Sequence, residues 1–246
     1  MKIIDWEQLP TEMQTEEVRK YYCILKSRRV SLYFKRMFDF IISVIALIIL
    51  SPVYLLLAIA IKIDSPGPVF YRQERITQYG KRFRIHKFRT MVQNADKGSQ
   101  VTVNNDSRIT RVGKVIRDCR LDEIAQLIDV IQGTVTLVGV RPESPKYVEK
   151  YTDEMMATLL LPAGVTSLAS IYYKDEAKLL DGVEDTDNVY IEKILPGKMY
   201  YNLKGLEQFN FWSDIKIIFM TVFAVLGKEY KGDYEEVVRE KEEIEV

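Results

Sequence analysis

The hydrophobic pattern of the chain contains one uninterrupted apolar run of 22 residues, from Phe40 to Ile61, which reads FIISVIALIILSPVYLLLAIAI and holds no charge. A straight helix rises about 1.5 Å per residue, so this run reaches about 33 Å. That length is enough to cross a hydrocarbon core about 30 Å thick. The pattern therefore predicts a membrane element.

Ser51 and Pro52 stand at the midpoint of this run. Pro52 has no N–H for the carbonyl of Ile48 and crowds it, at a cost of about 3 kcal/mol in a helix interior. The Ser51 hydroxyl can bond to a freed carbonyl, which makes the break tolerable in lipid. Two half-helices would each reach about 16 Å, half a bilayer. This favours a re-entrant helix that enters and leaves on one side.

Basic residues flank the run on both sides, whereas a single span normally carries them on its cytoplasmic side. They are Arg28, Arg29, Lys35 and Arg36 before it, and Lys62, Arg72, Arg75, Lys81, Arg82 and Arg84 after it. We interpret residues 35–63 as a re-entrant membrane helix, with a kinked single span as the alternative. A soluble core helix fits less well, because the run is long and holds no charge. A signal peptide fits less well, because the run is long and begins near residue 40.

Beyond the stiff turn at residues 64–68, apolar and polar residues alternate on both sides of Gln78-Tyr79-Gly80. This alternation predicts a β-hairpin. Residues 94–107 are polar and show no sustained apolar period, so we expect a loop there.

Helical spacing returns at Leu121, Ile124, Ile128 and Ile131, which predicts an amphipathic helix that Gly133 ends. The apolar segment 211–227 contains Asp214 and Lys216 and is short for a span. It fits an interfacial helix, and a core-facing helix is the alternative. Further elements are expected as short helices within residues 1–27, a strand over 134–140, a helix over 149–160, and a helix over 187–204 interrupted at Pro196-Gly197.

The fold class predicted by these elements is α+β. We expect a monotopic membrane protein with a Ser-Pro-broken re-entrant helix, a β-hairpin and a mainly helical cytosolic domain with interfacial helices. Its regions would be an N-terminal extension (1–34), the re-entrant helix (35–63), the cytosolic domain (64–228) and a charged C-terminal tail (229–246).

The charge of the chain is zero overall, so no global field attracts nucleic acid. Two distant cysteines, Cys23 and Cys119, indicate no disulfide framework and fit a reducing compartment. The single histidine, His86, excludes a histidine-rich zinc site within this chain. We interpret His86 as a structural strand residue and Cys119 as a packing residue. A metal would be held by carboxylate oxygen, which suits Mg²⁺.

Two adjacent carboxylates, Asp122 and Glu123, begin the amphipathic helix. Such residues often only complement the helix dipole. Here, basic residues crowd the same region: Arg108, Arg111, Lys114, Arg117, Arg120 and Arg141. Arginine binds phosphate oxygens bidentately, and a carboxylate can hold Mg²⁺ or attack phosphorus. Together they indicate a site for a metal-bound diphosphate, although attraction to anionic lipid also explains part of the basic run.

A resemblance to the bacterial sugar transferases, the monotopic polyprenyl-phosphate phosphoglycosyl transferases, rests on short motifs that keep the family's order between Lys35 and Gly227. They are KRMFDF, the Ser-Pro-broken helix, SPGPVFYRQER, KFRTM, GKVIR, RLDEIAQL, GVRPE, AGVTSLA and FWSDIKIIFMT.

The resemblance implies a two-step reaction that primes envelope glycan synthesis at the cytoplasmic face of a bacterial cell membrane. Asp122 would attack the β-phosphate of a UDP-sugar, release UMP and hold the sugar phosphate covalently. A polyprenyl (undecaprenyl) phosphate would then accept it. Glu123 would orient groups or assist proton transfer, and Asp122 would carry Mg²⁺. Phosphate would be bound by Arg117, Arg141, Lys87 and Arg89. Membrane lipids and a second copy in a homodimer are further expected partners, and nucleic acid is not.

Several positions depart from the family pattern, namely Ala125, Val140, the Ala163–Thr166 stretch, Lys174 and Asn202. These departures leave the sugar open. They also keep two other functions open: a non-catalytic membrane-anchored scaffold or regulator of polysaccharide assembly, and a lipid-phosphate enzyme such as a phosphatase.

Overall fold

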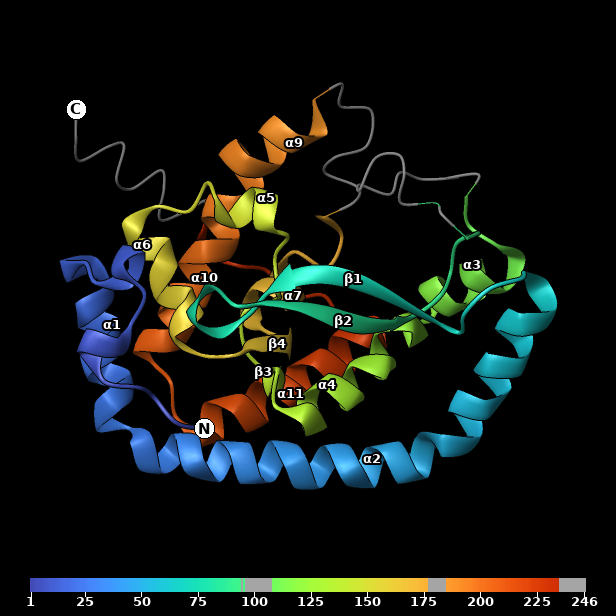
Figure 1. Cartoon of the computed structure of the whole chain (residues 1–246), viewed down its shortest axis with the longest axis horizontal. Helices are drawn as coiled ribbons and strands as arrows, with labels where there is room; N and C mark the ends of the chain where they lie inside the picture. The colour runs from blue at the N-terminus through green and yellow to red at the C-terminus, as the bar shows by residue number, and fades with distance from the viewer. Residues whose placement is uncertain (94, 96–107, 177–184, 235–246) are drawn as a thin grey trace.

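A long helix, α2 (Arg29–Asp64), frames the molecule. The computed structural model describes residues 1–93, 95, 108–176 and 185–234. Helix α2 runs along one side, bends, and continues along a second side, and the other described elements lie within the angle (Figure 1). The loop expected over residues 94–107 falls almost entirely outside the described residues, as does most of the C-terminal tail.

The bend in α2 replaces the break expected at Ser51 and Pro52. The helix continues through both residues, so the prediction of two separate half-helices is corrected to one bent helix. A proline inside a helix is a common cause of such a bend. The Ser51 hydroxyl donates a hydrogen bond of 2.8 Å to the carbonyl of Ile48. This carbonyl receives no backbone hydrogen bond from Pro52, because proline has no N–H.

The outer face of α2 is apolar and exposed. Among the described residues, α2 is the one helix long and apolar enough to cross a membrane, and only 6% of its apolar window is buried. Ile48, Ile49, Leu55 and Leu56 on either side of the bend are each more than 60% exposed. A soluble core helix would bury these side chains, so the exposed face favours contact with lipid.

The inner face of α2 is bound to the rest of the fold at both ends. Near its start, Arg36 donates to the carbonyls of Val130 (2.6 Å) and Ile131 (3.1 Å). At its last residue, Asp64 accepts from the backbone N–H of Val112 at 2.9 Å. Helix α2 and the elements that lie within its angle therefore form one packed unit.

The predicted β-hairpin is present. Strands β1 (Phe70–Ile76) and β2 (Arg82–Phe88) pair antiparallel across the middle of the molecule (Figure 1). The connecting turn contains Tyr79 and Gly80 at φ values of 59° and 72°. This left-handed conformation suits Gly80 and closes the turn at the position that the alternation predicts.

A second, parallel pair of strands was only half predicted. Strand β3 (Val135–Val138) lies in the expected run, but its partner β4 (Ala163–Thr166) was not foreseen. The two strands approach so closely that a Cβ at Gly164 would lie 2.2 Å from the backbone nitrogen of Gly139. Position 164 therefore has no room for a side chain larger than that of glycine.

The remaining helices cover both ends of these strands. Helix α11 (Phe211–Val225) lies beside α2, with Asp214 and Ile217 buried and Trp212 and Phe219 exposed, so it has both a core-facing and an exposed apolar face. The others are α1 (Glu16–Ser27), α3 (Arg111–Asp118), α4 (Leu127–Gln132), α5 (Pro145–Val148), α6 (Asp153–Met156), α7 (Leu168–Tyr172), α9 (Thr186–Val189) and α10 (Leu195–Glu207).

Two helical predictions need correction. The helix expected over 149–160 begins only at Asp153 and becomes a 3₁₀ turn from Ala157 to Leu160. Pro196 and Gly197 do not interrupt a helix, because they lie in the first turn of α10, where proline is tolerated. The irregularity lies just before them, in the π-helical turn Tyr190–Ile194.

Candidate active site

The carboxylate dyad, Asp122 and Glu123, lies in the 3₁₀ turn Leu121–Gln126, which leads into α4. Arg120, just before it, has a left-handed φ of 55°, so the chain turns sharply between α3 and the dyad. Leu121 and Ile124 pack into the apolar cluster that includes Phe88 and Ile61. This packing fixes the turn and leaves both carboxylates beside the hairpin.

Glu123 is held by two cations from different elements. Its Oε1 lies 2.5 Å from Nη2 of Arg141 and 3.3 Å from Nζ of Lys87 on β2. Burial opposes ionisation of Glu123, but Arg141 and Lys87 outweigh it and hold the pKa of the carboxyl far below its ordinary value. Glu123 is therefore an anion throughout the physiological pH range.

Asp122 has a different environment, although it is the adjacent residue. Nζ of Lys87 lies 3.9 Å from Oδ2 of Asp122. Burial raises the pKa of Asp122, and the charge of Glu123 adds to the rise, while Lys87 and Arg117 act against it. In the described part of the chain, Asp122 is thus held less closely by Lys87 than Glu123 is.

The other expected phosphate ligands are divided by the fold. Arg117 lies close enough to stabilise the charge of Asp122, and its Nε donates to Oγ1 of Thr90 at 2.8 Å. Arg89 is buried elsewhere and donates to the backbone carbonyls of Ser65 and Pro66, both at 2.7 Å. The structure therefore brings Lys87, Arg117 and Arg141 to the dyad, whereas the guanidinium of Arg89 closes the end of α2.

A magnesium ion fits Asp122 better than Glu123. No group of three or more His, Cys, Asp or Glu side chains in the described part of the chain is placed to hold a metal. Mg²⁺ commonly needs only one or two carboxylates together with substrate phosphates. Asp122 could supply one, while the Glu123 oxygen is already held by two cations.

His86 is a structural residue, as its place in a strand predicts. Its Nδ1 lies 2.7 Å from Oδ1 of the buried Asp129, and Nε2 lies 2.7 Å from Nη1 of Arg72. Because Arg72 can only donate, Nδ1 carries the proton and donates to Asp129. Cys119, by contrast, is exposed, so the prediction that it packs in the interior is wrong.

A buried polar cluster behind the dyad was missed. Glu143, two residues after Arg141, accepts hydrogen bonds from the Tyr190 hydroxyl at 2.5 Å and from Nζ of Lys198 at 2.9 Å. Lys198 also binds Glu176 at 3.1 Å. Lys198 is distant in sequence and lies in an ordinary helix, so no local pattern indicates it.

Tyr54 links the membrane helix to the dyad segment. It lies in α2 two residues after Pro52, and its hydroxyl donates to the backbone carbonyl of Ile124, the residue after Glu123. Its ring packs edge-on against Phe88, with centroids 5.1 Å apart. The half of α2 beyond the bend therefore helps to position the dyad.

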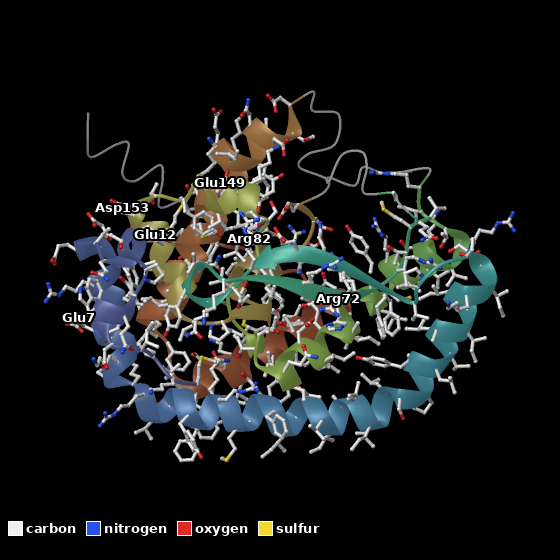
Figure 2. The ribbon with its side chains drawn as sticks, in the orientation of Figure 1. Glu7, Glu12, Arg72, Arg82, Glu149 and Asp153 are labelled. Atoms are coloured by element: carbon white, nitrogen blue, oxygen red, sulfur yellow. The ribbon has the colours of Figure 1, made fainter. Side chains whose placement is uncertain are left out.

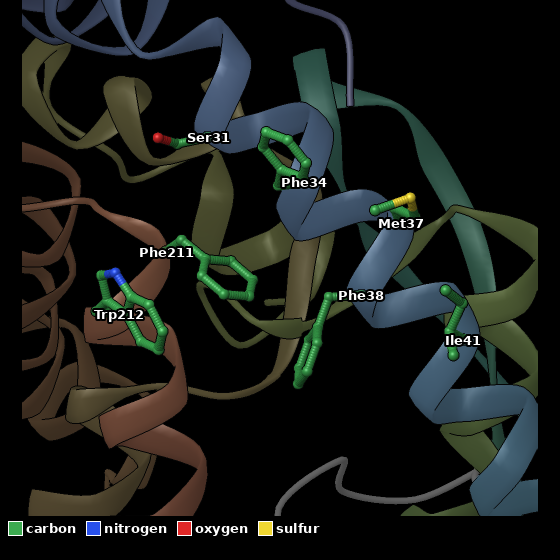
Figure 3. A pocket seen from close by; sticks show the side chains of 7 residues that line it. All are labelled: Ser31, Phe34, Met37, Phe38, Ile41, Phe211 and Trp212. Atoms are coloured by element: carbon green, nitrogen blue, oxygen red, sulfur yellow. The ribbon is translucent and has the colours of Figure 1, made fainter.

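An apolar groove of about 450 Å³ lies between the first half of α2 and the start of α11. Phe34, Phe38 and Ile41 on α2 face Phe211 and Trp212 across it (Figure 3). Phe38 and Phe211 make an edge-to-face contact with ring centroids 5.5 Å apart. The groove continues the apolar exposed faces of both helices.

The exposed apolar face of α2 is consistent with a membrane-associated protein, and its site is a carboxylate pair among cations. A model of the bacterial sugar transferase family matches residues 30–228, and the chain belongs to this family.

Curated relatives carry more specific names. The chain is 35% identical over 198 residues to an Aeromonas hydrophila UDP-N-acetylgalactosamine-undecaprenyl-phosphate N-acetylgalactosaminephosphotransferase, covering 79% of this chain and 44% of that protein. It is 36% identical over 200 residues to a Klebsiella pneumoniae UDP-glucose:undecaprenyl-phosphate glucose-1-phosphate transferase (79% and 40%), and 32% identical over 197 residues to one from Caulobacter vibrioides (78% and 69%). The chain spans less than half the length of the first two relatives.

Proposed function

We propose that this protein transfers a sugar 1-phosphate from a UDP-sugar to a membrane polyprenyl phosphate, the reaction type that the relatives' names describe. The observation that supports it best is the unequal dyad. Asp122 is a weakly paired carboxylate, and Glu123 beside it is bound by Lys87 and Arg141. Two adjacent carboxylates with opposite pKa shifts typically have different roles in a reaction.

In the first step, an oxygen of Asp122 attacks the β-phosphorus of the donor. A new phosphorus–oxygen bond forms to the carboxylate, the bond to the bridging oxygen breaks, and UMP leaves with that electron pair. In the second step, a phosphate oxygen of the polyprenyl phosphate attacks the same phosphorus and displaces the carboxylate of Asp122. A carboxylate needs no general base for this attack, because it is already ionised.

Glu123 would act through its cations. A carboxyl group with a strongly lowered pKa is a poor proton donor at neutral pH. We therefore favour orientation over proton transfer: Glu123 holds Lys87 and Arg141 beside Asp122, where they can bind the oxygens of the attacked phosphate. Mg²⁺ on Asp122 would supply charge neutralisation of the diphosphate.

The acceptor's hydrocarbon chain stays in the bilayer, so the site must lie at headgroup level. Helix α2 supports this placement, because polar groups near both of its ends bind the same domain. We propose that α2 is re-entrant and that the domain lies on the cytoplasmic face, where the product would prime envelope glycan synthesis.

The test is UMP release from a panel of UDP-sugars by detergent-solubilised protein with polyprenyl phosphate and Mg²⁺. We expect turnover with at least one sugar and loss of more than about a thousandfold in Asp122→Asn, which removes the attacking group. Arg89→Lys is the matched control, because Arg89 binds the end of α2 and lies apart from the dyad.

Full turnover by Asp122→Asn would refute the nucleophile assignment. A wild-type protein that binds lipid but turns over no UDP-sugar would favour a non-catalytic scaffold, and phosphate release without sugar transfer would favour a phosphatase.

A further inference from the structure

Arg75 is a half-buried arginine near the end of β1 that the reaction described above does not use. In the described part of the chain, its one hydrogen bond runs from Nη2 to Oε1 of Gln73 at 2.8 Å. A guanidinium carries five N–H donors in a planar fork that matches phosphate geometry. Most of the donors of Arg75 are therefore available to another acceptor.

The fold directs Arg75 toward the dyad. In the hairpin register Tyr71 lies opposite Lys87 and Arg75 opposite Phe83, so Arg75 and Lys87 share one face of the hairpin. The backbone N–H of Ile76 donates to the carbonyl of Glu143 at 3.0 Å, which holds the end of β1 against the segment that follows Arg141. Arg75, Lys87 and Arg141 thus border the same space.

Electrostatics agree with this geometry. Burial lowers the pKa of Arg75, the charge of Glu143 raises it, and the smaller effect of Arg141 lowers it again. The charge of Arg75 in turn helps to lower the pKa of Lys87, after burial and Arg141. Arg75 and Arg141 each lower the pKa of another of these cations, and an anion bound among them would relieve this repulsion.

The three cations do not have the same neighbours. Lys87 and Arg141 bind Glu123, directly beside Asp122, so they are placed for the phosphate that Asp122 attacks. Arg75 donates to Gln73 instead and lies on the neighbouring strand opposite Phe83, four residues along the hairpin from Lys87. A donor that carries two linked phosphates needs a second anion site at such a position.

We propose that Arg75 binds the second phosphate of the donor, the α-phosphate of a nucleoside diphosphate, which leaves with the nucleotide. This inference rests on the proposed transferase function and adds a donor ligand to it. The competing explanation is that Arg75 only balances the charge of Glu143. However, Glu143 already accepts hydrogen bonds from Tyr190 and Lys198.

The test compares Arg75→Gln with Arg82→Gln in the full-length protein. Arg82, labelled in Figure 2, lies on the same hairpin, but its ion pair with Glu74 is solvent-exposed. Binding of UMP and of UDP is measured by calorimetry. We expect Arg75→Gln to weaken both by at least about tenfold, Arg75→Lys to recover part of the loss, and Arg82→Gln to change neither by more than about twofold.

Three results would overturn the proposal: unchanged UMP affinity in Arg75→Gln, a lowered melting temperature with unchanged nucleotide affinity, or a change confined to the KM for polyprenyl phosphate. The second would show a structural role beside Glu143, and the third would assign Arg75 to the acceptor. Because UMP binding needs no turnover, a wild-type protein that binds UMP but transfers no sugar would refute the transferase and still allow the Arg75 comparison.

Discussion

At the scale of single residues, position in the fold decides the role more than residue type. Asp122 and Glu123 are neighbours, yet burial raises the pKa of Asp122 while Arg141 and Lys87 outweigh burial at Glu123 and lower its pKa. Lys87 and Arg89 are two residues apart, yet Lys87 reaches the dyad and Arg89 binds the carbonyls of Ser65 and Pro66. From their charges alone, Asp122, Glu123, Lys87 and Arg89 would all be expected in one site.

Glu143 gives a prediction of pH-dependent stability. Burial disfavours its charge, but Lys198 and Tyr190 outweigh burial, so the pKa of Glu143 lies below the ordinary value of 4.5. Its stabilisation is complete above pH 4.5 and is lost as the pH falls through the lowered pKa. We expect Glu143→Gln to cost about 3 kcal/mol at neutral pH, because it leaves Lys198 poorly paired, and less in acid.

Urea unfolding of the two proteins between neutral pH and about pH 3 measures this difference. The control is Glu207→Gln, which removes an exposed pair with Lys20 and should cost less than about 1 kcal/mol. A Glu143→Gln penalty that stays constant across the pH range would contradict the ionisation argument.

At the scale of elements, close backbone contacts set the geometry around the site. The pair β3–β4 depends on the contact between Gly139 and Gly164, and the loop after β3 carries Arg141 to Glu123. The hairpin carries Lys87 to the same carboxylate. Each strand is short, but together they fix the cations around one carboxylate pair.

Gly164→Ala tests this packing. A Cβ at position 164 would meet the Gly139 backbone at 2.2 Å, and backbone atoms cannot move aside as a flexible side chain can. We expect a loss of about 2 kcal/mol in unfolding free energy and weaker UMP release, because Arg141 follows the displaced strand. Gly205→Ala is the control: it lies in α10 with open space around it and should stabilise the protein by about 1 kcal/mol. Equal stability of Gly164→Ala and wild type would refute the close contact.

The sequence predicted the elements that depend on local pattern. Alternation around Gln78-Tyr79-Gly80 gave the hairpin, and apolar length gave α2. It missed β4, since Ala163 to Thr166 is short and contains a glycine that only a tertiary contact explains. It also missed Lys198 and Tyr190, because nothing near them in sequence indicates the distant Glu143. The sequence grouped Arg89 with the phosphate ligands because the KFRTM motif shows that the residue is charged but not which way its side chain points.

At the scale of the whole molecule, helix α2 and the segment that carries Asp122 and Glu123 belong to one packed structure. The N-terminal segment is also part of it, since Met13, Val18 and Leu25 are fully buried in a cluster with Leu160. The segment around these three residues is therefore packed on the domain that holds the dyad, and α2 begins at Arg29, earlier than expected.

Sided labelling tests the re-entrant course of α2. In a Cys23→Ser, Cys119→Ser background, Val30→Cys places a single thiol at an exposed site in the first turn of α2, and Arg82→Cys places one at an exposed site after the helix. We expect a membrane-impermeant thiol reagent to leave both unlabelled in intact cells and to label both after permeabilisation. Labelling of only one thiol in intact cells would show that α2 spans the bilayer.

The hydrogen bond from Tyr54 to Ile124 joins the half of α2 beyond the bend to the turn that carries Asp122. Any force that opens or closes the bend at Pro52 moves Tyr54, and with it the turn that carries Asp122. Where α2 lies in a bilayer, as we propose, lipid thickness, lateral pressure and the choice of detergent would act on the position of Asp122, and a rate measured in one of these environments would apply to that environment alone.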